Sequence, residues 1–220
     1  MLLNTLKSSL VIMFSKMRFL LFLVFVFGFC NLANANVCAI YKITPKITIK
    51  TPEINKTVVQ PDEPMNLTHG NVEATLVNNY EVVVDVRQYL TGFCVILKSV
   101  DATIGYKDFL VQIDKRHEPE SCAYNVILDH ENQHIDAYLS VIEDYKKDLH
   151  ESLYSAANSI MPVFVQGQSD VVKIVDVLND KLQKHPDIVL TIQKIHADEE
   201  IKNKVIDEHE DYSELKKCLE

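Results

Sequence analysis

Residues 121–150 contain neither glycine nor proline, and their apolar side chains recur every three to four positions. This pattern predicts one long helix with an inward face. The helix carries the sequence His130-Glu131-Asn132-Gln133-His134. Residues four apart lie one turn apart on the same helical face, so the two imidazoles can bind one metal ion. Glu131 lies beside that face, where it can accept a proton from a metal-bound water.

The H-E-x-x-H pattern resembles the metal-binding helix of zincin-type zinc peptidases. The likeness implies Zn2+ as cofactor, His130 and His134 as ligands and Glu131 as catalytic base. A longer match, His130-Glu131-x-x-His134-Ile135-Asp136 after a block of strands, resembles a bacterial family of exported zinc proteases of uncharacterised function, from which no substrate carries over. The metzincin group is excluded, because it requires glycine at position 137 and histidine at position 140, where this chain has Ala137 and Ser140.

The two histidines are predicted to face the protein interior, because they share a helical stripe with apolar and aromatic side chains. The residues of this stripe are Ala123, Val126, Ala137, Val141 and Tyr145. The alternative is a half-buried helix whose histidines only hydrogen-bond to their neighbours.

A zinc site needs a third protein ligand, with a fourth position left for water. Glu199 is the first candidate, because it falls within an apolar arc of a predicted later helix, where a carboxylate needs a partner or a cation. The arc consists of Ile188, Ile192, Ile195 and Ile206. His196 and Glu200 are the next candidates. The alternative is that Glu199 pairs with a lysine or arginine or lies at a ragged edge of the helix. The histidines predicted to lie on the surface are His69, His117, His185 and His209.

Residues 1–35 have the three parts of a secretory signal peptide. Lys16 and Arg18 precede an apolar run at residues 19–29, and Ala33-Asn34-Ala35 follows it. The run is shorter than the about 20 residues of a membrane span, so no stable span is expected after cleavage. Met17 is an alternative start, and a retained anchor is the alternative to cleavage. The sequence predicts a secreted or periplasmic protein.

The chain is acidic, with a net charge of −9. Removal of residues 1–35 takes away three basic residues and no acidic one, which makes the remaining domain more acidic. Such a domain repels nucleic acid and anionic membranes. We therefore expect no nucleic-acid partner. The resemblance to zinc peptidases implies a peptide or protein substrate, and no oligomeric state is predicted.

Four cysteines follow the predicted signal peptide: Cys38, Cys94, Cys122 and Cys218. An even number of cysteines in an exported chain predicts two disulfide bonds, with three possible pairings. Chain order favours Cys94 with Cys122 and Cys38 with Cys218, and leaves the other pairings open.

Short strand-like segments precede the long helix, among them the alternating Ile47-Thr48-Ile49. Turns between these segments are predicted at Asn78-Asn79, Thr91-Gly92 and Gly105. Helical segments follow the long helix, so we expect an α+β fold. We expect a loose extended arm over residues 36–71 and a single metallopeptidase-like domain over residues 72–220. The domain should contain an antiparallel sheet, then the H-E-x-x-H helix, then C-terminal helices, in a zincin-like arrangement. Residues 109–114 are expected to be the edge strand that binds the substrate backbone in zincins, or else an ordinary strand.

The sequence thus predicts a secreted zinc-dependent peptidase that hydrolyses peptide bonds through a water activated by Glu131. The first alternative is a non-catalytic exported envelope or binding protein whose H-E-x-x-H helix is structural or a relic. The second alternative is a metal-binding protein without hydrolytic activity.

Overall fold

The computed structural model describes residues 37–65, 68–208 and 213–220. The predicted signal peptide, residues 1–35, and His209 lie outside the described residues. The chain divides into two units, residues 1–40 and residues 41–220. All strands and the helices α2 to α5 belong to the second unit. A short 3-10 helix, η1 (Ala39–Tyr41), ends at the first residue of this unit. None of the described helices is both long enough and apolar enough to cross a membrane.

The described residues form one sheet, in which each of the remaining strands pairs with β4. Its strands are β1 (Lys46–Lys50), β2 (Lys56–Val59), β3 (Gly70–Tyr89), β4 (Gly92–Ile113) and β5 (Val163–Val165). Strand β3 pairs antiparallel with β4 from end to end through a tight turn at Leu90 and Thr91. The other edge of β4 is shared by β5, β1 and β2 in succession along its length, with β5 antiparallel and β1 and β2 parallel.

The α+β class is therefore confirmed, but the purely antiparallel sheet is wrong because β1 and β2 run parallel to β4. Both short strands lie in the segment predicted as a loose arm, so that segment is part of the sheet. The turns predicted at Asn78-Asn79 and at Gly105 are also wrong: Asn78 pairs with Ile104, and Val77 with Gly105, inside the long hairpin. Continuous pairing along 20-residue β3 and 22-residue β4 overrides these local turn signals.

Gly105 has a packing role within β4. Its φ of 151° lies in a region that side-chain-bearing residues rarely adopt. A Cβ at this position would lie 2.8 Å from Cδ of Pro52, in the connection between β1 and β2. The absence of a side chain therefore lets this connection cross close to β4.

The predicted long helix is α2 (Cys122–Ser159), 38 residues in length. Ser121 caps it by accepting a hydrogen bond from the backbone N–H of Tyr124 at 3.2 Å. Its inward face is apolar and packs against β4 and β3. The fully or almost fully buried residues of this face include Ile127, Val141, Ile142, Leu149 and Leu153.

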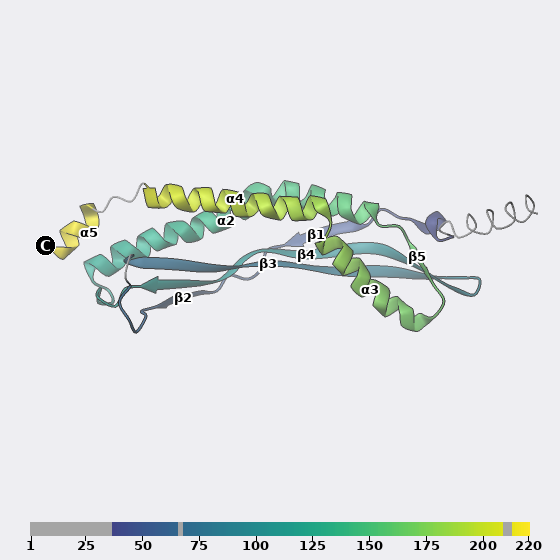
Figure 1. The fold of residues 1–220 in the computed structure, drawn as a ribbon, viewed down its shortest axis with the longest axis horizontal. Helices are drawn as coiled ribbons and strands as arrows, with labels where there is room; N and C mark the ends of the chain where they lie inside the picture. The colour runs from purple at the N-terminus through teal and green to yellow at the C-terminus, as the bar shows by residue number, and fades with distance from the viewer. Residues whose placement is uncertain (1–36, 66–67, 209–212) are drawn as a thin grey trace, which may run out of the picture. The chain divides into compact units, whose positions relative to one another are not determined.

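Three further helices follow: α3 (Gln168–Gln183), α4 (Pro186–Glu208) and α5 (Ser213–Leu219). Helix α4 runs beside α2 (Figure 1). A line of polar contacts fixes the two helices in an antiparallel register. The contacting pairs are Ser152 with Thr191 at 2.6 Å, Tyr145 with Asp198 at 2.7 Å and Asp144 with Lys202 at 2.6 Å. This register brings the C-terminal end of α4 to the H-E-x-x-H segment.

The four cysteines that follow the predicted signal peptide are all disulfide-bonded, as predicted, but the preferred pairing is wrong. Cys122 bonds to Cys218, with their Cα atoms 5.4 Å apart. Because α4 runs antiparallel to α2, the chain that follows it returns to the start of α2, where Cys122 lies. Chain order alone does not reveal this return.

Candidate metal centre

His130 and His134 project from one face of α2, as the four-residue spacing predicts. Their Nε2 atoms lie 3.2 Å apart. The His130 side chain is 16% exposed and that of His134 is 12% exposed, so both imidazoles are largely enclosed. Two ring nitrogens that face each other at this separation can bind one ion in common.

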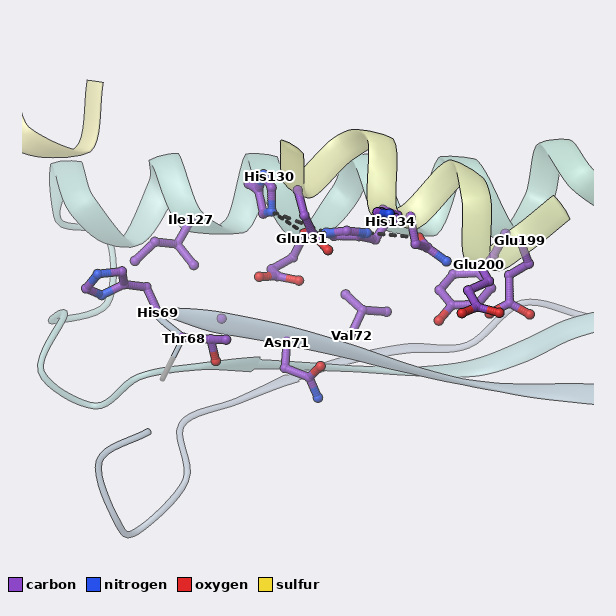
Figure 2. Close-up of a pocket in the computed structure, with 15 residues that line it drawn as sticks. Thr68, His69, Asn71, Val72, Ile127, His130, Glu131, His134, Glu199 and Glu200 are labelled. Carbon is purple, nitrogen blue, oxygen red and sulfur yellow. Dashed lines mark hydrogen bonds and ion pairs between the residues drawn. The ribbon is translucent and has the colours of Figure 1, made fainter. Parts of the chain in front are cut away.

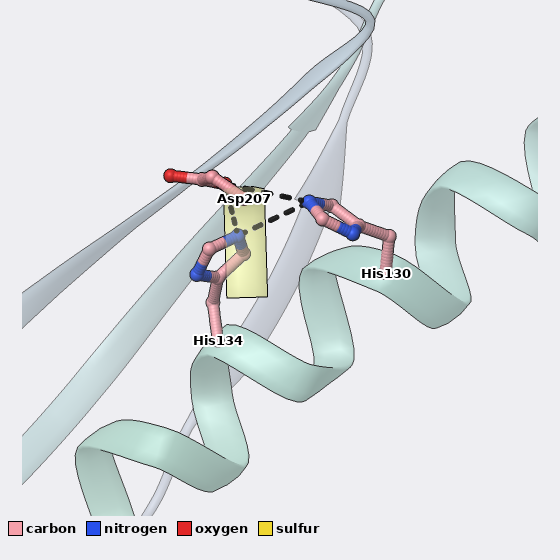
Figure 3. Close-up of side chains that lie close together, drawn as sticks. All are labelled: His130, His134 and Asp207. Atoms are coloured by element: carbon pink, nitrogen blue, oxygen red, sulfur yellow. Dashed lines mark hydrogen bonds and ion pairs between the residues drawn. The ribbon is translucent and has the colours of Figure 1, made fainter. Parts of the chain in front are cut away.

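The carboxylate that meets the two imidazoles is that of Asp207, in the last turn of α4 (Figure 3). Its Oδ1 lies 3.1 Å from Nε2 of His134 and 3.6 Å from Nε2 of His130. The three candidate ligand atoms all lie within 4.8 Å of one another. The Asp207 side chain is 63% exposed, so the site opens towards solvent on the α4 side.

Asn203 lies one turn before Asp207 on α4 and supports His134 from behind. Its Oδ1 is 2.9 Å from Nδ1 of His134. Because an amide oxygen accepts a hydrogen bond, Nδ1 of His134 carries the proton and Nε2 keeps its lone pair. That is the tautomer a metal ligand needs, and such outer contacts orient the ligands of metal sites.

Two imidazole nitrogens and one carboxylate oxygen are a ligand set that suits zinc, with a fourth position left for water or substrate. The same set also suits other divalent transition metals, so the ligand atoms do not specify the metal. The fit rests on the convergence of the three groups and on the tautomer that Asn203 imposes on His134.

Glu131 is 4% exposed and extends from α2 towards the first residues of β3 (Figure 2). Gly70, the first residue of β3, lies directly against it. A Cβ on Gly70 would come within 2.2 Å of Oε1 of Glu131 and 2.7 Å of Cγ2 of Ile127. The missing side chain at position 70 therefore makes the space that the Glu131 carboxylate occupies.

These groups share a pocket of about 710 Å³ between α2, α4 and the start of β3. Figure 2 shows His69 and Glu199 far apart in it, with Glu131 between them. The residues that line it are Thr68, His69, Gly70, Asn71, Val72, Ile127, His130, Glu131, His134, Tyr138, Glu199, Glu200, Asn203, Lys204 and Asp207.

Glu199, the predicted third ligand, lines this pocket but lies apart from the ligand group, which contains Asp207 instead. Its carboxylate accepts a hydrogen bond from the hydroxyl of Tyr106. Burial, and then the Glu199 carboxylate, raise the pKa of both Tyr106 and Tyr138. Glu199 thus hydrogen-bonds a tyrosine, whereas the sequence predicted that it binds the metal, with a lysine or arginine as the alternative partner.

The two other candidates for third ligand are also outside the ligand group. His196 is 54% exposed, and its Nδ1 lies 3.4 Å from Oε2 of Glu199. Glu200 lines the pocket from an exposed position.

The predicted substrate-binding edge at residues 109–114 is wrong. Residues 109–112 pair with β2 on one side and residues 110–113 with β3 on the other, so this segment is interior. The strand beside the site is the start of β3, whose residues 70–72 line the pocket. Sequence position alone cannot distinguish an edge strand from an interior one.

The surface prediction for the other histidines fails at His117, which is 6% exposed. Its Nε2 lies 3.0 Å from Nδ1 of His69, and His69 lines the pocket. The sequence around His117 is polar, which led to the prediction of a surface position, although the side chain is buried in the fold.

Asp207, Asn203 and Gly70 were not predicted as site residues. One signal could have found the first two: Asn203 and Asp207 have the same four-residue spacing as His130 and His134, so each pair occupies one helical face. Nothing in the sequence indicates that Gly70 faces Glu131.

No protein-family model, no curated protein and no solved structure matches this chain. The zincin-like arrangement therefore stays a prediction.

Proposed function

We propose that this chain is an exported zinc-dependent peptidase whose metal ligands are His130, His134 and Asp207. The observation that supports this best is the convergence of the three ligand atoms within 4.8 Å, beside a buried glutamate of the H-E-x-x-H segment. The ligand set fits zinc, and the resemblance to zincin-type peptidases points to peptide hydrolysis.

Zinc at such a site supplies Lewis acidity, which brings the pKa of a coordinated water towards 7 and polarises a substrate carbonyl. The chain's own residues carry the remaining steps. Glu131 removes the proton from the attacking water and delivers it to the leaving amine. Asn203 keeps Nε2 of His134 unprotonated, because it holds the ring proton on Nδ1.

The substrate in this proposal is an extended peptide that lies along the first residues of β3. These residues line the pocket, and the strands of the described ranges pair with β3 on its β4 side only. The other edge of β3 therefore offers backbone N–H and C=O groups for strand addition. Gly70 leaves the peptide and Glu131 close to each other, because no side chain stands between them.

An exported location fits the disulfide-bonded cysteines, since such bonds persist in oxidising compartments. The predicted signal peptide agrees with it. Secretion and a periplasmic location are both compatible with these features.

The test is the zinc content of the exported protein, measured by mass spectrometry without a His-tag and compared with His130→Ala. We expect about one zinc per wild-type chain, lost in the variant. Glu131→Gln should then retain zinc and lose hydrolysis of an unstructured polypeptide. Zinc without any hydrolysis by the wild type would leave a metal-binding protein. Absence of zinc from both chains, even after incubation with zinc at neutral pH, would leave the non-catalytic exported protein.

A further inference from the structure

His69 is the pocket residue whose surroundings the proposed reaction does not yet use. It directly precedes Gly70 and lines the same pocket as Glu131 and His134. The His69 ring meets the ring of His117 edge-on, with centroids 5.1 Å apart and an interplanar angle of 60°. Its Nδ1 lies 3.0 Å from Nε2 of His117, so one of these nitrogens donates a hydrogen bond to the other.

His117 is a rigid support for this contact. It is 6% exposed, and burial lowers its pKa, which keeps the ring neutral. Its backbone N–H donates to the carbonyl of Asp114 at 3.0 Å, and Nε2 of Gln60 donates to its carbonyl at 2.6 Å. Asp114 also holds His69, because its N–H donates to the His69 carbonyl at 2.9 Å. Both the backbone and the ring of His69 are therefore fixed.

A second metal ion is a poorer explanation for the two rings. The described residues contain one group of three or more possible ligands, and it includes neither His69 nor His117. The nearby Asp114 carboxylate is occupied by Arg116, through contacts of 2.9 Å and 2.6 Å.

The contact with His117 occupies Nδ1 of His69 and leaves Nε2 available. Within residues 37–65, 68–208 and 213–220, no hydrogen bond to this Nε2 is found. An extended peptide presents N–H and C=O groups alternately. Nε2 can therefore pair with a peptide whether it carries the proton or not.

We propose that His69 is a substrate-binding residue, which hydrogen-bonds the backbone of a peptide lying along the start of β3, and that His117 is its positioning residue. This inference rests on the proposed peptidase function and adds to it one contact with the substrate backbone that takes no part in the bond change. Such a contact stabilises substrate and transition state alike, so its loss should raise KM and leave kcat nearly unchanged.

The test measures kcat and KM for hydrolysis of reduced, carboxymethylated lactalbumin by the zinc-loaded exported protein. His69→Phe keeps an aromatic ring and removes the hydrogen bond, and KM should rise about 2- to 10-fold. His117→Phe should shift KM in the same direction, and His69→Gln should restore part of the loss. His150→Phe, on the exposed side of α2, is the matched control and should behave as wild type.

Binding separates this inference from the proposed function. The Kd of the fluorescently labelled polypeptide is measured for Glu131→Gln with and without His69→Phe. If Glu131→Gln binds the polypeptide and the double variant that also carries His69→Phe binds it more weakly, the inference is supported. Equal binding by the two proteins overturns the inference and leaves the peptidase intact, as does a fall in kcat or zinc content in His69→Phe. No hydrolysis by wild type and no binding by Glu131→Gln overturn both.

Discussion

Asn203 and His134 face each other across the two long helices, with the amide oxygen of Asn203 2.9 Å from Nδ1 of His134. The contact fixes the tautomer of a proposed metal ligand. Asn203→Ala should therefore weaken zinc binding about 10- to 100-fold, as loss of such outer contacts does elsewhere. Competition with a chelator of known affinity measures the change. Asn203→Asp, which keeps an acceptor at this position, is the control and should retain most of the affinity. Equal zinc affinity in Asn203→Ala and wild type would contradict the role.

Asp207 and Glu199 lie two turns apart on α4. Replacing each carboxylate by the corresponding amide shows which of the two side chains binds the metal. Asp207→Asn should reduce the zinc content, because Oδ1 of Asp207 lies 3.1 Å from Nε2 of His134. Glu199→Gln should retain zinc, because Glu199 is bound by Tyr106. Mass spectrometry after dialysis against a weak chelator compares the two variants. The opposite result, zinc loss in Glu199→Gln alone, would restore Glu199 as the third ligand.

Gly70→Ala tests the close approach of β3 to the proposed base. The added methyl group would lie 2.2 Å from Oε1 of Glu131, so either the carboxylate or the strand has to move. We expect kcat/KM to fall at least about 100-fold, since displacements of about 1 Å near a reacting centre have that effect. The zinc content should stay the same. Gly167→Ala is the matched control, because the added Cβ would lie 3.4 Å from its nearest neighbour, Oδ2 of Asp170, which is an ordinary contact. Wild-type activity in Gly70→Ala would show that Glu131 does not need this space.

The H-E-x-x-H helix could be predicted because its signals are local. The four-residue spacing of its histidines, the apolar stripe and the absence of glycine and proline all lie within the helix. Asp207 depends instead on the antiparallel register of α4 against α2, which contacts such as Ser152 with Thr191 determine. The spacing of residues within one helix does not predict how α2 and α4 align with each other.

The sheet shows the same division between local and non-local information. The alternation at Ile47-Thr48-Ile49 predicts β1 correctly, and the turn at Thr91-Gly92 is close to the observed turn at Leu90 and Thr91. The strand pairs that include Asn78 and Gly105 could not be predicted, because each residue is kept extended by a partner on the opposite strand. Which strand lies at the edge near the site follows from the same distant pairings.

The Cys122–Cys218 disulfide joins residues 96 positions apart and fastens α5 to the first residue of α2. A cross-link over a segment of this length restricts the unfolded chain strongly. Cys218→Ser paired with Cys122→Ser should lower the free energy of unfolding by about 2–5 kcal/mol. Urea unfolding measures this, with Lys216→Ser, at an exposed position of α5, as the control. A double variant as stable as wild type would show that the bond does not support the fold.

Asp114 makes the stability of this protein depend on pH in the acid range. Its carboxylate is fully buried and accepts hydrogen bonds from the Arg116 side chain and from the N–H groups of Arg116 and Met65. The Arg116 guanidinium, helped by these N–H groups and opposed by burial, holds the pKa of Asp114 well below its usual value. A carboxyl group whose pKa is lower in the folded state stabilises the fold above its unfolded pKa, about 3.9, and loses that contribution as the pH falls towards the folded value.

Asp114→Asn should therefore lower the free energy of unfolding by about 1–3 kcal/mol at pH 7. The difference between wild type and variant should stay constant down to about pH 4 and then shrink with further acidification. Urea unfolding at a series of pH values measures it. Asp85→Asn is the control, because Asp85 pairs with Arg87 at the surface, where such pairs contribute little. A difference that grows as the pH falls below about 4 would contradict the sign of this linkage.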